Sequence, residues 1–307
     1  MSIELPRYSF TKASGLSSGL EIAFTNQIYN YPIDTTFSLV PVTRQNQVSE
    51  LLHFQTEWIE NNLGLNIKHR LPHPNKILFL PSTHFRSVAS VSNSRGFVQS
   101  FTGGIYTEEC ERDKQTMYIF SHELIHGMEY RLFNVKSNDR GQLGVSFPEK
   151  TGYRLTSENQ FHGVNEWLTE LENMDLHTTN GGTAIGKEVL QEKRIPYTDE
   201  VLFLDTLIIN AADKLGVPAQ SIRHHLFKGL YIDGDPLRLA VLDSAFGVKI
   251  SKLFELTTET VYGADRLRDW TRQIGIDIGE KYIDQVAAYK AGDIIKVLDG
   301  RYIRQVE

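Results

Sequence analysis

Apolar residues recur at helical spacing in two stretches near the middle of the chain. Within residues 113–134, four apolar residues lie three or four positions apart, and within 164–176 three more follow the same period. Spacing of this kind places the apolar side chains on one face of an α-helix, so both stretches are predicted to be amphipathic helices. The two stripes are Met117, Phe120, Leu124 and Met128 in the first stretch, and Val164, Leu168 and Leu171 in the second.

The pattern before these helices alternates between strand and helix. β-branched and apolar residues predict a strand over 35–42, and a short apolar run predicts another over 76–81. Residues 43–63 have helical periodicity and end at Gly64. Residues 95–109 predict one or two strands, and the turn-rich stretch 141–155 predicts a small hairpin. The order of these elements indicates an α+β fold.

The two ends of the chain differ in character. Residues 19–24 favour a strand, and the remainder of 1–34 has the composition of a loop. One possible role for 1–34 is a pro-segment. From Pro196 onward, amphipathic helices follow one another. We therefore expect an N-terminal segment of unclear role (1–34), a central domain (35–195) and an all-helical C-terminal domain (196–307), with the last boundary near 190–196.

Composition narrows the class of protein. The chain has 307 residues, 23% of them charged, and a formal net charge of −6 without a basic stripe, which argues against nucleic acid as a partner. No apolar run reaches the roughly 18 residues that would span a membrane. The chain starts without a secretory signal and contains one cysteine, so we expect a cytoplasmic protein, although export without a signal stays open. Cys110 has no activating neighbour identifiable in the sequence and is expected to be an inert thiol.

Residues 120–130, FSHELIHGMEY, carry the candidate chemistry. His122 and His126 are four residues apart, which is about 400° of helix, so both imidazoles leave the same face one turn apart. One helix can in this way supply two nitrogen ligands to one zinc ion. Glu123 flanks that face and could take a proton from a zinc-activated water. In a chain with 10 histidines, this pattern arises by chance in about 2 of 100 sequences.

A catalytic zinc ion needs a third protein ligand and an open fourth position. Glu166 and Glu170 are four apart on the second predicted helix and therefore share a face. We expect Glu166 to be the ligand and Glu170 to accept the free ring N–H of a zinc-bound histidine. The alternative for this pair is a solvated acidic helix face.

HELIH followed by NEWLTE resembles the gluzincin branch of the zincin metallopeptidases, which includes thermolysin. The resemblance covers about 35–180, and Glu166 follows His126 by 40 residues, a longer gap than in thermolysin that the hairpin would account for. It implies that 35–195 form a zincin-like catalytic domain with a small mixed sheet. It also implies a Zn²⁺ cofactor, zinc ligands at His122, His126 and Glu166, and a general base at Glu123. It also matches Asn165 to the asparagine before the third ligand and Glu170 to the outer-sphere acid.

The resemblance also implies a substrate strand and an oxyanion donor. In that fold an edge strand beside the active site pairs with an extended substrate, and GGIYTE (103–108) is expected to be that strand, with Gly103, Gly104, Ile105 and Tyr106 binding substrate. The oxyanion of the tetrahedral intermediate needs a Tyr or His. Tyr153 is the first candidate and His162 the second. Tyr197 and the pair His224–His225 are further possibilities.

Three functions follow from these residues. The first is a zinc-dependent peptidase with a peptide or protein substrate, in which Glu123 is the general base. The second is a zincin-fold protein that binds metal and has a regulatory or binding role without peptidase activity, which the unassigned oxyanion donor motivates. The third is a helical protein without metal. The sequence does not predict the substrate or the oligomeric state.

Overall fold

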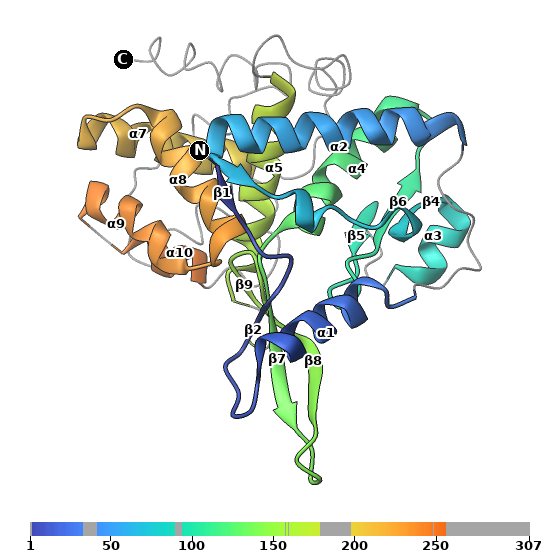
Figure 1. The fold of residues 1–307 in the computed structure, drawn as a ribbon. Coiled ribbons are helices and arrows are strands. Elements are labelled where there is room, and N and C mark those ends of the chain that lie inside the picture. Colours follow the sequence, from blue (N-terminus) through green and yellow to red (C-terminus); the bar gives the residue numbers. More distant parts are fainter. Residues whose placement is uncertain are drawn as a thin grey trace. The chain divides into compact units, whose positions relative to one another are not determined.

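A computed structural model describes residues 2–32, 42–89, 94–156, 158, 160–178, 198–247 and 249–255. The described part is an α+β protein with small sheets, as the sequence pattern predicts (Figure 1). The chain divides into two compact units, Met1–Gly152 and Tyr153–Glu307, and each is described in turn.

The first unit contains a small mixed sheet that carries the substrate-strand prediction. Strand β4 (Ile77–Pro81) is parallel to β6 (Ile105–Glu109), and β5 (Gly96–Val98) is antiparallel to β6 on its other side. The order β4-β6-β5 therefore makes β6 the central strand. The prediction that 103–108 form the edge strand is wrong, because β6 has a hydrogen-bonded partner on each side. The edges of this sheet are β4 and β5, and β5 is the edge strand that contacts the HELIH helix.

Helix α4 (Asp113–Met128) packs against this sheet. All four residues of the predicted stripe are fully buried. The rings of Phe79 in β4 and Phe120 in α4 lie 5.3 Å apart. Gly127 allows the helix to approach β6 closely, because a Cβ there would lie 3.0 Å from the Ile105 side chain. The sheet therefore fixes the depth and rotation of the helix that carries the two histidines.

The helix ends six residues earlier than its predicted limit of 134. Glu129 leaves helical geometry with φ −57° and ψ 160°, and β7 (Arg131–Ser137) begins two residues later. Alternate residues of β7 are buried from Arg131 to Val135, which is the period of a strand. The guanidinium groups of Arg70 and Arg131 donate to the carbonyls of Met128 and His126, respectively, and so bond two of the last carbonyls of α4.

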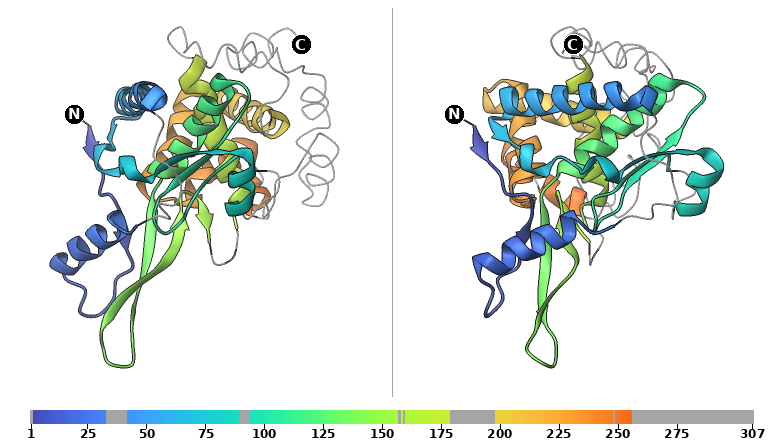
Figure 2. Two further views of the ribbon diagram at one scale, coloured as in Figure 1. Left: turned by 90° about the vertical axis from the view of Figure 1, so that its right-hand side faces the viewer. Right: turned by 45° about the vertical axis from the view of Figure 1, so that its right-hand side comes forward.

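The predicted hairpin forms, with an earlier start than expected. Strand β7 pairs antiparallel with β8 (Leu143–Thr151), and the turn between them holds Gly141 at a φ of 73°. All three views show the hairpin extending away from the rest of the first unit (Figures 1 and 2). The hairpin supplies most of the long separation in sequence between the HELIH motif and Glu166.

The N-terminal residues are built into the first unit. Strand β1 (Ile3–Glu4) pairs with β3 (Leu65–Asn66), and β2 (Ser9–Phe10) pairs with β7, both in parallel. The prediction of a strand over 19–24 is wrong, because those residues lie in α1 (Ser18–Tyr29), whose N-terminus is capped by Ser17. Helix α2 (Val42–Leu63) confirms the helix predicted over 43–63. The remaining elements of this unit are α3 (Ser82–Val88) and the short 3₁₀ turns Lys68–Arg70 and Pro74–Lys76.

The second unit is mainly helical in its described part. Helix α5 (His162–Thr178) contains the predicted stripe, which is fully buried, and so confirms the helix predicted over 164–176. Helices α7 and α8 both pack against α5. Helices α9 and α10 pack against each other. The elements of this unit are β9 (Arg154–Leu155), α5, α7 (Thr198–Leu215), α8 (Ala219–Ile232), the 3₁₀ turn Pro236–Leu239, α9 (Ala240–Phe246) and α10 (Ile250–Glu255).

Some expectations fall outside the described residues. These are residues 35–41 of the strand predicted over 35–42, the boundary near 190–196, Tyr197 and the helices predicted after 255. The last residue of that predicted strand, Val42, begins α2. The three predicted domains therefore stay a prediction beside the observed division at Gly152 and Tyr153. None of the helices that the structure describes has the length and apolar character required to cross a membrane.

Candidate metal centre

Helix α4 brings the two histidines of HELIH together as their spacing predicts. Their Nε2 atoms lie 3.2 Å apart, and the rings are almost perpendicular, with centroids 4.8 Å apart. His122 is 8% and His126 9% exposed, so both rings are largely removed from solvent. Two imidazole nitrogens on one helix face thus point at a common position.

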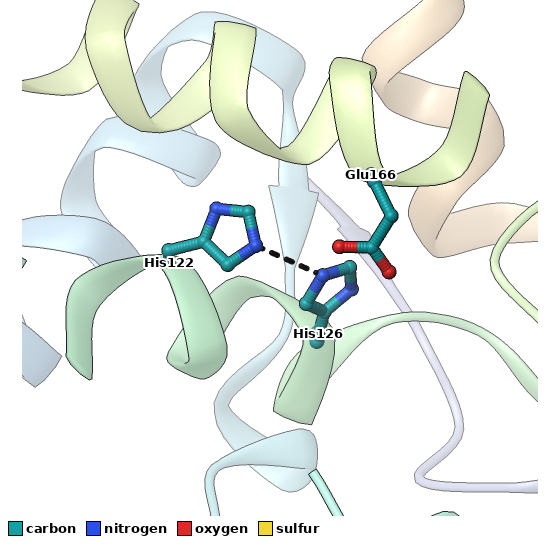
Figure 3. A group of neighbouring side chains, drawn as sticks. All are labelled: His122, His126 and Glu166. Atoms are coloured by element: carbon teal, nitrogen blue, oxygen red, sulfur yellow. Dashed lines mark hydrogen bonds between the residues drawn. The ribbon is translucent and has the colours of Figure 1, made fainter. Parts of the chain in front are cut away.

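Glu166 on α5 completes the set that the sequence predicts. One ligand atom from each of His122, His126 and Glu166 lies within 4.8 Å of the other two. Figure 3 shows the three side chains pointing toward one another. Nitrogen ligands about 2.0–2.1 Å from a tetrahedral zinc ion are about 3.3–3.4 Å apart. The 3.2 Å between the two Nε2 atoms is close to that separation, and the His₂Glu donor set is one that catalytic zinc uses.

Glu129 is a further carboxylate at this centre, and the sequence reasoning missed it. Its Oε1 lies 2.8 Å from Nδ1 of His126, and its side chain has no exposed surface. The resemblance to gluzincins implies Glu170, not Glu129, as the outer-sphere acid. The signal in the sequence was the three-residue spacing from His126, which places Glu129 near the same face just beyond the end of α4.

Glu123 lies beside the edge strand β5. A Cβ built on Gly96 would come within 2.5 Å of Glu123 Cγ and 2.6 Å of Oε1. Glu123 is 8% exposed. The absence of a side chain at position 96 therefore leaves the space that the Glu123 carboxylate occupies. The helix position next to His122 keeps Glu123 near the histidine face, as the sequence predicts.

Asn165 and Glu170, the two other polar residues of NEWLTE matched to the gluzincin pattern, are both buried. The Oδ1 atom of Asn165 accepts a 2.8 Å hydrogen bond from the backbone N–H of Tyr153 and so ties that residue to the start of α5. Glu170, one turn after Glu166, is 1% exposed. Glu170 is therefore not part of a solvated acidic helix face, which was the alternative interpretation of this pair. Its outer-sphere role stays a prediction.

His162 lies next to the candidate ligand Glu166. Its Nδ1 is 3.7 Å from Glu166 Oε1, and its side chain is 24% exposed. The residue before it, Phe161, has a φ of 57°, a left-handed conformation that is rare for a bulky side chain. Strained backbone of this kind often occurs at functional sites. Of the two oxyanion candidates, His162 is the one near Glu166.

Tyr153 instead has a well-defined structural contact. Its hydroxyl donates a 2.8 Å hydrogen bond to the carbonyl of Leu226, and its side chain is fully buried. Burial raises the pKa of Tyr153, with Arg238 opposing the rise. Gly229 provides the space for the ring, since a Cβ there would overlap the Tyr153 hydroxyl. The structure therefore gives no support to Tyr153 as the oxyanion donor.

The predicted substrate-binding residues lie in and after a turn. The amide of Gly103 donates to the Gln99 carbonyl, and that of Gln99 donates to the Gly104 carbonyl, so this turn joins β5 to β6. Gly103 has a φ of 69°, and the Arg131 guanidinium occupies the space where a Cβ would be. Ile105 and Tyr106 are buried in central β6. The assignment of substrate binding to these residues loses its basis, because it depended on an edge strand.

His224 and His225 lie on α8 in the second unit. The Nε2 of His224 is 2.6 Å from the Gln220 side-chain nitrogen. Among the described residues, His122, His126 and Glu166 are the cluster of three or more His, Cys, Asp and Glu side chains that could hold a metal ion.

The chain was compared with protein-family models, with curated proteins and with solved structures, and none of the three comparisons gives a match.

Proposed function

We propose that this protein is a zinc-dependent peptidase of the gluzincin type. The observation that carries the proposal is the convergence of the ligand atoms of His122, His126 and Glu166 within 4.8 Å. Two imidazoles and a carboxylate leave a fourth position for water or substrate, as a catalytic zinc site requires. The proposal includes a zincin-like catalytic domain that contains the sheet β4-β6-β5, α4 and α5, followed by a helical C-terminal domain.

Each residue has a defined task in the proposed reaction. A bound zinc ion would activate water and polarise the scissile carbonyl. Glu123 accepts the proton of the attacking water and returns it to the leaving amine. His162 is the candidate donor to the oxyanion, since it lies 3.7 Å from Glu166. Tyr153 has no part, because its hydroxyl bonds to Leu226.

The proposed substrate is a peptide or protein segment in extended conformation along β5. The carbonyl of Arg95 accepts from the Glu108 amide, and the Gln99 amide donates to the Gly104 carbonyl. Bonding alternates along an antiparallel pair, so the backbone groups of Gly96 and Val98 point away from β6. A peptide could pair by strand addition with the backbone groups of Val98 and with the amide of Gly96, whereas the Gly96 carbonyl accepts from the Ser94 hydroxyl. Gly96 also borders Glu123, so this strand would bring a scissile bond near the base.

The test is Glu123→Gln in protein loaded with stoichiometric zinc. The amide keeps the shape of Glu123 but accepts no proton, so zinc content should stay at one ion per chain while peptide turnover falls by about 10²–10⁴-fold. Glu57→Gln is the control, because Glu57 is an exposed residue of α2. Elemental analysis and a diverse peptide library provide the two measurements.

Two other outcomes would point to the alternative functions. Wild-type protein that holds zinc and cleaves nothing in the library would favour a metal-binding protein with a regulatory role. The contact of the Tyr153 hydroxyl with the Leu226 carbonyl is the observation that favours this alternative, because it removes the first candidate for the oxyanion donor. Zinc far below one ion per chain, with no recovery on addition of zinc, would overturn both metal-dependent functions.

A further inference from the structure

We infer that Glu129 is the positioning residue of the metal centre, the carboxylate that orients His126 and presents its Nε2 lone pair to the metal. The inference rests on the proposed zinc site. The carboxylate–imidazole contact is 2.8 Å from Oε1 to Nδ1, within the range of a charge-assisted hydrogen bond. Both groups are in the first unit, at the C-terminal end of α4.

The contact determines which ring nitrogen carries hydrogen. A carboxylate only accepts hydrogen bonds, so Nδ1 of neutral His126 must be the protonated nitrogen. Nε2 then carries the lone pair, and this atom faces Nε2 of His122 at 3.2 Å. A zinc ligand needs a bare nitrogen, and a carboxylate on the other ring nitrogen also raises its basicity. Glu129 thus prepares His126 for a metal before the metal binds.

The surroundings of Glu129 hold it in this position. Its side chain is buried without exposed surface, and a buried carboxylate is costly unless a cation is near. Arg131 supplies that charge. It is 2% exposed. Burial lowers the pKa of Arg131, and the charges of Tyr8 and Glu129 raise it, which shows that Glu129 and the guanidinium interact. Arg131 also donates to the His126 carbonyl, so the charge partner is tied to the same turn of helix.

The turn at the end of α4 is what makes this geometry possible. Glu129 lies three residues after His126, and its backbone has already turned to φ −57° and ψ 160°. Its carboxylate can therefore reach the ring from beyond the helix end, where no further helical turn intervenes. The resemblance to gluzincins assigned the outer-sphere acid to the helix of the third ligand. The geometry points to an additional acid on the helix of the two histidines.

The first experiment uses metal-free wild-type protein at pH 8, where a free imidazole is neutral. Long-range ¹H–¹⁵N correlation spectra distinguish the two neutral tautomers of His126. We expect the tautomer with hydrogen on Nδ1. Hydrogen on Nε2 would overturn the inference. This readout needs neither zinc nor a variant, so it is decided separately from the proposed peptidase activity.

The second experiment measures zinc affinity by competition with a chromogenic chelator. Glu129→Gln removes the charge but keeps the size of the side chain, and we expect zinc binding about 10–100-fold weaker. Glu172→Gln is the matched control. Glu172 is also a fully buried carboxylate on a hydrogen bond, 2.6 Å from the Tyr231 hydroxyl, but it belongs to the second unit. The Glu172→Gln variant should lower the melting temperature, because it weakens a buried hydrogen bond, and should change zinc affinity by less than about twofold.

The visible spectrum of bound Co²⁺ separates positioning from stability. A positioning role predicts altered d–d bands in Glu129→Gln and unaltered bands in Glu172→Gln. If Glu129→Gln does not fold, Glu129→Asp keeps the charge and shortens the reach, and its zinc affinity should be reduced in the same direction. Wild-type zinc affinity in a folded Glu129→Gln protein would overturn the inference. If the wild type binds no zinc, the proposed function fails and the tautomer measurement still tests the contact.

Discussion

At the scale of single residues, the position of Glu123 depends on the absence of a side chain at Gly96. A Cβ at 96 would lie 2.5–2.9 Å from three atoms of the Glu123 side chain. Those atoms belong to a side chain that can move, so an added methyl group displaces the carboxylate more readily than it disrupts the backbone. A general base that moves by about 1 Å loses alignment with its substrate, at a cost of about 100-fold in rate.

We therefore predict that Gly96→Ala lowers peptide turnover by roughly 100-fold at full zinc occupancy. Zinc affinity should stay within about twofold of wild type, and the change in unfolding free energy should be below about 1 kcal/mol, since no metal ligand is touched. The measurements are turnover, chelator competition and urea unfolding. Gly144→Ala is the control, because a Cβ on that exposed strand residue meets nothing within 4 Å. Unchanged turnover in Gly96→Ala would contradict the assigned position of Glu123.

At the scale of elements, the N-terminal segment is part of the first unit. The strands β1 and β2 pair with β3 and β7, respectively, and α1 buries Phe24 and Ile28. A segment that contributes strands and core residues stabilises the fold. Loss of residues 1–30 would expose the edges of β3 and β7 and the apolar surface that α1 covers. The pro-segment hypothesis would require that residues 1–34 could leave without loss of stability.

Two isoleucines of α1 allow a matched test of this packing. Ile28 is fully buried and Ile22 is 63% exposed on the same helix. Ile28→Ala should lower the unfolding free energy by about 2–5 kcal/mol, because it removes buried methyl groups and leaves a cavity. Ile22→Ala should change it by less than about 0.5 kcal/mol. Urea unfolding of the metal-free protein measures both, and equal effects would show that α1 is not packed as described.

At the scale of the whole molecule, polar groups are buried in the core of the second unit. Arg223 donates to Asp205 at 2.8 Å, and both side chains are almost completely buried. His177 at the end of α5 is fully buried, and burial lowers its pKa to about 3. Between pH 6.5 and about pH 3, the unfolded chain therefore binds a proton at His177 that the folded chain does not bind.

Global stability should consequently fall as the pH is lowered below 6.5. The contribution of His177 is about 1.4 kcal/mol per pH unit below about pH 6. His177→Gln should show a shallower loss of unfolding free energy from pH 6.5 to pH 4.5 than wild type, whatever its stability at pH 8. His53→Gln is the control, since the side chain of His53 is 74% exposed. Denaturant unfolding with a chelator present removes any contribution from zinc, and parallel curves for His177→Gln and wild type would refute this role.

The sequence alone determined the features that depend on local periodicity. The helical period of the apolar residues predicted α2, α4, α5, α7 and α8. The four-residue spacing placed His122 and His126 on one helix face. The resemblance of HELIH and NEWLTE to gluzincins predicted Glu166 as the third ligand, and its carboxylate lies near both histidines. These are short-range relations, which the geometry of a single helix decides.

Only the tertiary structure decided what depends on contacts between distant residues. Strand order made β6 central and left β4 and β5 at the edges, because the pairing of distant segments cannot be read from the local pattern of apolar residues. Residues 129–134 left the helix because β7 has partners in β2 and β8 and because Arg70 and Arg131 bond the last carbonyls of α4. Packing also brings the Tyr153 hydroxyl to the Leu226 carbonyl and the Glu129 carboxylate to Nδ1 of His126. A side chain's role in this protein follows from the neighbour it meets, and neighbours far apart in the chain are set by packing.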